Sequence, residues 1–185
     1  MELLTPFSFD MNVKLFIEVG AFFDSEPFIN ECRKLTVPKE IGKFSIPENL
    51  ETITYGQRLD LSDIKPEDFL FTPLRILTGA KLEEILLLKA CDVIRVTFHV
   101  IDQLQELNKR DEKYLKYEPS KEELKAGLLK MNHGVFGVID NIARRMRITH
   151  DQVLDLSQQK VFMMLKIDID NANYARNLRT VLTDK

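Results

Sequence analysis

A long amphipathic stripe runs through residues 81–110 and limits this chain more than any other feature. Its members recur every three or four positions: Val93, Thr97, Val100, Leu104 and Leu107. Positions with that spacing share one face of an α-helix, whereas a strand would require alternation. The opposite face is charged and polar, for example at Asp92, Arg95 and Asp102. The pattern therefore predicts a long helix lying on a hydrophobic core.

Further helices are predicted after Pro119. Ser120-x-x-Glu123 and Thr149-x-x-Gln152 have the form of capping boxes, in which two side chains bond reciprocally to backbone N–H groups at a helix start. The apolar seam 124–146 contains glycines, so either close helix contact compensates for them or the helix breaks near Gly134. A last helix is expected over residues 172–182, with Asp170 or Asn171 as its N-cap.

The N-terminal part carries mixed signals. Residues 13–19 nearly alternate between apolar and polar and favour a strand, although a helix remains open. A short helix should follow Asp24 and Ser25, with Pro27 in its first turn. Two β-prone runs, 43–46 and 52–55, are separated by a turn-rich stretch and predict a small hairpin or two edge strands. Short helices then follow, and Gly79 is placed to end one of them.

These elements define a mainly α, multi-helix domain with a small β-hairpin element near residues 42–61. We expect an N-terminal interaction segment over residues 1–40 and a mainly helical domain over residues 41–185. The charged run that ends before Pro119 marks a hinge near residues 108–119.

An internal similarity connects the two halves of the chain. A shift of 68 positions aligns Glu83-Glu84-Ile85-Leu86 with Asp151-Gln152-Val153-Leu154, and Val93 with Val161. One interpretation is a duplicated helix-turn-helix unit. The other is chance, because amphipathic helices often share a binary pattern.

The sequence contains no recognisable catalytic, metal or cofactor site. The three histidines are scattered, and no glycine-rich phosphate loop follows a strand. Cys91 and His99 lie about two turns apart on one predicted helix, which favours structural burial of Cys91 over a nucleophile and base. Asp168-Ile169-Asp170-Asn171 begins like a calcium loop but lacks the later ligands. We therefore expect a non-enzymatic protein without cofactors or metals.

Charge and cysteine content narrow the class of protein further. The net charge of −3 argues against nucleic acid as the main partner. No apolar run reaches the roughly 20 residues of a membrane span, and the first residues do not resemble a signal peptide. Cys32 and Cys91 are far apart in sequence, so we expect two reduced thiols in a cytoplasmic protein.

Two groups of side chains are candidates for contacts with other molecules. Aromatic residues are concentrated in the first 28 positions, which suggests that this segment docks onto another chain: Phe7, Phe9, Phe16, Phe22, Phe23 and Phe28. Arg144, Arg145 and Arg147 form a basic cluster at the end of a predicted helix. The cluster complements the helix terminus or an acidic partner, or alternatively binds nucleic-acid phosphates.

Two stretches resemble small assembly proteins of tailed bacteriophages. The string T-x-G-Q-x-x-D-L at residues 54–61 is followed by the leucine-rich turn Leu77-Thr78-Gly79. Residues 135–156, which end in Leu154-Asp155-Leu156, are similar to helical parts of neck and tail-assembly proteins, including those of crAss-like phages. These short strings carry no catalytic motif, so the resemblance transfers no functional residue.

The resemblance implies a structural subunit of a tailed-phage particle that associates with itself in a neck or tail ring. Its partners would be copies of itself and other phage structural proteins, with no membrane. It would be located in the virion, and in the host cytoplasm during assembly. The alternatives are a phage tail assembly chaperone and a helix-turn-helix regulator that binds nucleic acid through the arginine cluster.

Overall fold

The computed structural model describes residues 7–21, 24–65, 68–117, 119–127 and 133–183. Helices dominate this part of the chain, and its one sheet is a two-stranded antiparallel hairpin. The predicted mainly α fold with a small hairpin is confirmed. The chain forms two compact units. The N-terminal unit comprises Met1–Ile53 and Gln57–Gln105, and the C-terminal unit comprises Thr54–Gly56 and Glu106–Lys185.

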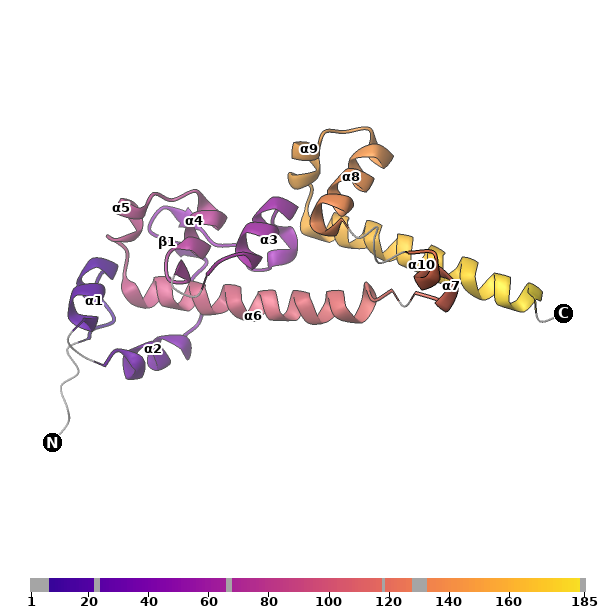
Figure 1. The fold of residues 1–185 in the computed structure, drawn as a ribbon. Coiled ribbons are helices and arrows are strands. Elements are labelled where there is room, and N and C mark those ends of the chain that lie inside the picture. Colours follow the sequence, from indigo (N-terminus) through magenta and orange to yellow (C-terminus); the bar gives the residue numbers. More distant parts are fainter. Residues whose placement is uncertain (1–6, 22–23, 66–67, 118, 128–132, 184–185) are drawn as a thin grey trace. The chain divides into compact units, whose positions relative to one another are not determined.

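The N-terminal unit gathers short elements around the first half of one long helix (Figure 1). These elements are α1 (Val13–Gly20), α2 (Glu26–Arg33), β1 (Glu40–Ile41), β2 (Phe44–Ser45), η1 (Leu50–Thr52), α3 (Tyr55–Ser62), α4 (Thr72–Thr78) and α5 (Leu82–Ile85). The long helix is α6 (Ala90–Tyr114). Its predicted core face is confirmed, because Val93 and Val100 are fully buried and the other three members of the stripe, Thr97, Leu104 and Leu107, are no more than 8% exposed.

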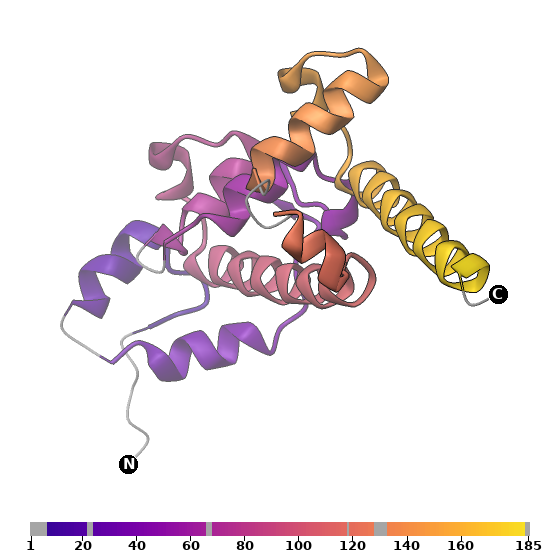
Figure 2. The same cartoon turned by 45° about the vertical axis from the view of Figure 1, so that its right-hand side comes forward.

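The C-terminal unit contains α7 (Lys121–Lys125), α8 (Gly134–Met146), α9 (His150–Leu154) and the long helix α10 (Gln158–Thr183). In Figures 1 and 2, α8 and α9 lie beside the beginning of α10, and the rest of α10 extends beyond them. Ile142, Val153 and Val161 form the centre of this small core, each with no more than 1% of its surface exposed.

Residues 13–19, predicted as a strand, form helix α1 instead. The Asn12 side chain accepts a hydrogen bond from the backbone N–H of Leu15 at 2.9 Å, which caps the helix. Val13 and Phe16, three residues apart, are both buried. The cap and the buried helical face therefore outweigh the local β-propensity of the segment.

The hairpin lies at residues 40–45, at the start of the predicted region. Glu40 pairs with Ser45 and Ile41 with Phe44, and Gly42 takes a left-handed φ of 59° in the turn. The second β-prone run does not join this sheet. Thr54 instead forms an isolated bridge with Ser157, and α3 begins at Tyr55.

The helices of the C-terminal unit differ from the prediction at one point. Both capping boxes form, since Glu123 and Gln152 each accept from the backbone N–H three residues earlier, at 2.7 Å and 2.9 Å. A new helix begins at Gly134, which has a φ of 55°. Residues 168–171 were expected to cap the last helix, but they lie inside α10. No glycine or proline interrupts residues 158–183, so the helix continues through them.

The similarity at a shift of 68 positions corresponds to a repeated structure. In each copy a helix ends at a residue with a left-handed φ, Gly79 at 70° or Arg147 at 56°. A short helix follows, at whose start the backbone N–H of Lys81 or Thr149 donates to the side chain three residues later, Glu84 or Gln152, and then a long helix. The interpretation as a duplicated helix-turn-helix unit therefore gains support from local structure as well as from sequence.

A backbone bridge completes each copy. The residue just before the long helix, Lys89 or Ser157, pairs with an earlier segment at Asn12 or Thr54. The N–H of Val13 donates to the Leu88 carbonyl at 2.9 Å, and the N–H of Tyr55 donates to the Leu156 carbonyl at 2.7 Å. Lys89 and Ser157 are again 68 residues apart, but their partners Asn12 and Thr54 are 42 apart, so the incoming segments play the same part without belonging to the repeat.

Cys32 and Cys91 lie together in the N-terminal unit, although 59 positions separate them in sequence. The two thiols are hydrogen-bonded, are buried at 0% and 3% exposure, and are not joined by a disulfide. Burial, first, and the neighbouring Cys91, second, hold the pKa of Cys32 well above its ordinary value of 9.0. This pair fastens α2 to the start of α6.

Ile85→Ala tests the packing of the repeat. Ile85 is fully buried, so its truncation should lower the free energy of unfolding by about 2–5 kcal/mol. Leu87 belongs to the same segment but is 75% exposed, so Leu87→Ala should change the free energy of unfolding by less than about 0.5 kcal/mol. Urea denaturation followed by circular dichroism measures both values. Equal effects of the two substitutions would contradict this packing.

Alkaline pH should destabilise the protein through Cys32. The unfolded thiol ionises near its ordinary value of 9.0, while the folded thiol stays protonated. The protonated Cys32 thiol therefore gives its full contribution to stability below that pH. As the pH rises above it, the free energy of unfolding falls by less than about 1.4 kcal/mol per pH unit. Urea midpoints between about pH 8 and about pH 10 should fall more steeply for the native chain than for Cys32→Ala. Identical slopes would refute this role.

Candidate interaction site on the C-terminal helix

Cys91, which was considered as a nucleophile, lies in the core of the N-terminal unit. Cys91 is 3% exposed and bonds Cys32, and His99 lies two turns further along the same helix, α6. Among the described residues, no three His, Cys, Asp or Glu side chains are grouped closely enough to hold a metal ion. Within the same residues, no helix is both long and apolar enough to span a bilayer.

The N-terminal aromatic residues pack mainly against one another inside their own unit. Phe28 of α2 lies 5.5 Å from Phe7 and 5.6 Å from Phe16 between ring centroids, and all three are buried. Phe7 and Phe16, expected to dock onto another chain, therefore belong to this core. Phe9 is half exposed, at 50%. Phe22 and Phe23 lie outside the described residues.

The arginine cluster engages carboxylates of its own unit. Arg144 pairs with Asp140 at 2.8 Å, and Arg145 pairs with Asp168 of α10 at 2.7 Å. Both arginines lie in the last turn of α8, where a positive charge is favourable near the negative helix end. Arg147 takes the left-handed position that ends α8. These arrangements agree with a helix-terminus role for the cluster.

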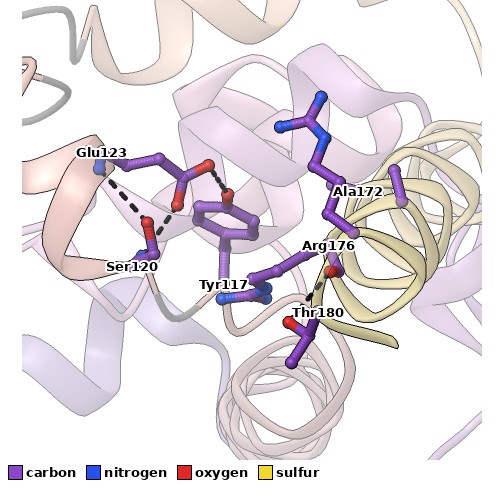
Figure 3. Close-up of a pocket in the computed structure, with 8 residues that line it drawn as sticks. Tyr117, Ser120, Glu123, Ala172, Arg176 and Thr180 are labelled. Atoms are coloured by element: carbon purple, nitrogen blue, oxygen red, sulfur yellow. Dashed lines mark hydrogen bonds between the residues drawn. The ribbon is translucent and has the colours of Figure 1, made fainter. Parts of the chain in front are cut away.

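A polar seam joins α7 and the segment before it to α10 (Figure 3). The Tyr117 hydroxyl donates to Glu123 at 2.5 Å, and the Arg176 guanidinium lies 5.2 Å from the centre of the Tyr117 ring. The hydrogen bond from Tyr117 is the main cause that lowers the pKa of Glu123, and the same bond raises the pKa of Tyr117. A cavity of about 640 Å³ lies along this seam.

Such a cavity has the volume of a small-molecule pocket, but polar side chains that line it are already bonded within the chain. Ligand pockets are mostly apolar with a few polar groups that orient the ligand. Here Glu123 is held by Tyr117 and by the Ser120 backbone, and Arg176 also bonds Asn173. The polar groups of the seam thus connect α7 to α10, which gives it a structural role.

Large apolar side chains are exposed along α10. We define the α10 stripe as the five residues that share one side of this helix and are at least 44% exposed: Met163, Ile167, Tyr174, Leu178 and Val181. At about 100° per residue, all five fall within about 60° of one another around the helix axis. They form the largest regular group of exposed apolar residues on a single helix in the described part of the chain.

The α10 stripe faces away from the core that holds the helix. Val161 and Phe162 are buried, and each projects more than about 120° from the centre of the stripe. Ala172, Ala175 and Arg176, which line the seam with α7, also lie outside it. The helix is therefore apolar on two sides, of which only one is covered within its own unit. A helix with apolar residues on both sides is normally buried on both.

Sequence reasoning identified this site only in part. The last helix was expected over residues 172–182, a range that holds Tyr174, Leu178 and Val181 but leaves out Met163 and Ile167. The absence of a helix breaker over residues 158–183 was the signal that would have joined them. Which side the core covers depends on tertiary contacts.

Comparison with known proteins finds no protein-family model, curated protein or solved structure that matches this chain. The candidate site consequently rests on its geometry.

Tyr117→Phe tests the electrostatics of the seam. Loss of the hydroxyl donor should raise the pKa of Glu123 toward its ordinary value of 4.5. Carboxyl carbon shifts in an NMR titration measure this pKa directly. Tyr114→Phe, which removes a hydroxyl from α6, should leave the Glu123 titration unchanged. If Glu123 titrates at its ordinary value in the native chain, the hydrogen bond is absent in solution.

Proposed function

We propose that this protein is a non-enzymatic structural subunit of a tailed-phage particle, which associates with itself and with other structural proteins through helix faces. The observation that carries the protein-binding part is the α10 stripe. Tyr174 and Val181 leave 69% and 63% of their surface exposed, on the side of α10 that faces away from its own core. Contact with another chain would remove this apolar surface from water.

The phage part of the proposal is supported by the resemblance of residues 54–61, 77–79 and 135–156 to small assembly proteins of tailed phages. The low net charge of −3 is compatible with close packing of many copies. Any arm formed by the first 40 residues would use Phe9 and parts outside the described residues, because Phe7, Phe16 and Phe28 are already packed together.

A nucleic-acid regulator is less consistent with the structure. A recognition helix places the residues of its first turn against the bases. The short helix that follows α8 has only five residues and carries Asp151 in its first turn. Arg144 and Arg145 are also paired with carboxylates, which weakens their attraction for phosphates.

Mass spectrometry of purified particles tests the proposed function. The protein should be present in mature virions of the phage that encodes it, in a constant ratio to the other structural proteins through successive purification steps. Its absence from virions, together with its recovery from lysates in complex with a tail protein, would replace the structural role by that of a tail assembly chaperone. Absence from both would end the proposal.

A further inference from the structure

The spacing along α10 is that of a coiled-coil helix. Six positions alternate three and four residues apart, which is the a and d pattern of a heptad repeat: Met164, Ile167, Asn171, Tyr174, Leu178 and Val181. They extend over about 26 Å of helix at 1.5 Å per residue. Four of them belong to the α10 stripe, and Asn171 is exposed between them.

This series is complementary to itself when two copies run in opposite directions. In an antiparallel pair, each a position lies beside a d position of the other helix. Met164 then meets Val181, and Ile167 meets Leu178, at both ends of the contact. Asn171 meets Tyr174 twice at the centre. The aliphatic residues and Met164 thus face one another, and the Asn171 amide faces the Tyr174 phenol, which can donate a hydrogen bond to it.

The helix dipoles favour the same direction. An antiparallel pair places the positive beginning of each α10 near the negative end of the other, whereas a parallel pair would bring like ends together. The ion pairs of α10 do not take part in this contact, because Asp168 pairs with Arg145 and Asp170 with Lys166, while Arg176 lies against Tyr117.

We propose that two copies of this chain pair through an antiparallel contact between their α10 helices, with Asn171 and Tyr174 at the two-fold axis. The contact deepens the self-association in the proposed function, but it does not depend on the phage assignment. The same surface patch serves both copies, so the contact closes on itself and leaves other surfaces free for further subunits.

Sedimentation equilibrium of the full chain tests the pairing. The native protein should reach twice the mass of one chain as its concentration rises. Leu178→Glu places a charge opposite Ile167 of the partner at both ends of the contact and should weaken the dimer at least about tenfold. Thr180→Glu adds the same charge to an exposed position on another side of α10 and should leave the dimer unchanged. Circular dichroism confirms that all three proteins are folded.

Disulfide cross-linking tests the direction. A chain that carries both Ile167→Cys and Leu178→Cys should form a covalent dimer on oxidation, because each cysteine then faces the other in the partner. Each single substitution should remain uncross-linked, while a parallel pair would cross-link both single variants. Cys32 and Cys91 are buried in their own unit, and oxidation of the native chain measures any cross-linking that they cause.

A native chain that stays monomeric at every concentration would overturn the pairing, as would equal effects of Leu178→Glu and Thr180→Glu. A partner other than a second copy would appear as a monomer with an intact α10. A dimer in solution from a protein that is absent from virions would uphold the pairing and refute only the structural phage role.

Discussion

One backbone contact organises each unit of this protein. The Leu88 and Leu156 carbonyls, just before the two long helices, accept hydrogen bonds from Val13 and Tyr55. Each bond joins segments more than 70 residues apart in sequence, and it also positions a helix start, since α1 and α3 begin at the donor residues. Each small core therefore forms only when its two distant segments pack together. The C-terminal unit therefore needs Thr54–Gly56 from the first half of the chain.

The two long helices, α6 and α10, bury corresponding residues near their start but differ further along. Val93 and Ile94 of α6 correspond to Val161 and Phe162 of α10, and all four are buried. Further along, α6 continues its buried face with Val100, Leu104 and Leu107. The positions of α10 that correspond to these three hold Asp168, Ala172 and Ala175. Compared with α6, α10 thus lacks large apolar residues at these inner positions and carries them on its outer side.

Local chemistry made part of this fold predictable. Ser120, Thr149 and Gly79 act through neighbours in sequence, and the helix ends they predicted are present. The strand predicted over residues 13–19 was wrong because burial of Val13 and Phe16 depends on a distant segment. The cap predicted near Asp170 was wrong for a different reason. An acidic residue also stabilises a helix interior when a lysine lies four positions away, as Lys166 does here.

The candidate site was the least predictable part, and the reason is physical. Periodicity shows which residues share a face, but a helix that is apolar on two sides looks like a buried helix in sequence. Only the packing of Val161 and Phe162 shows which side of α10 is covered. The aromatic residues near the N-terminus illustrate the opposite case. Their sequence predicts contact with another chain, but Phe7 and Phe16 pack with Phe28 inside their own unit. An apolar side chain therefore indicates an interface only if the chain's own core leaves it uncovered. On α10, a regular apolar face stays uncovered in this way.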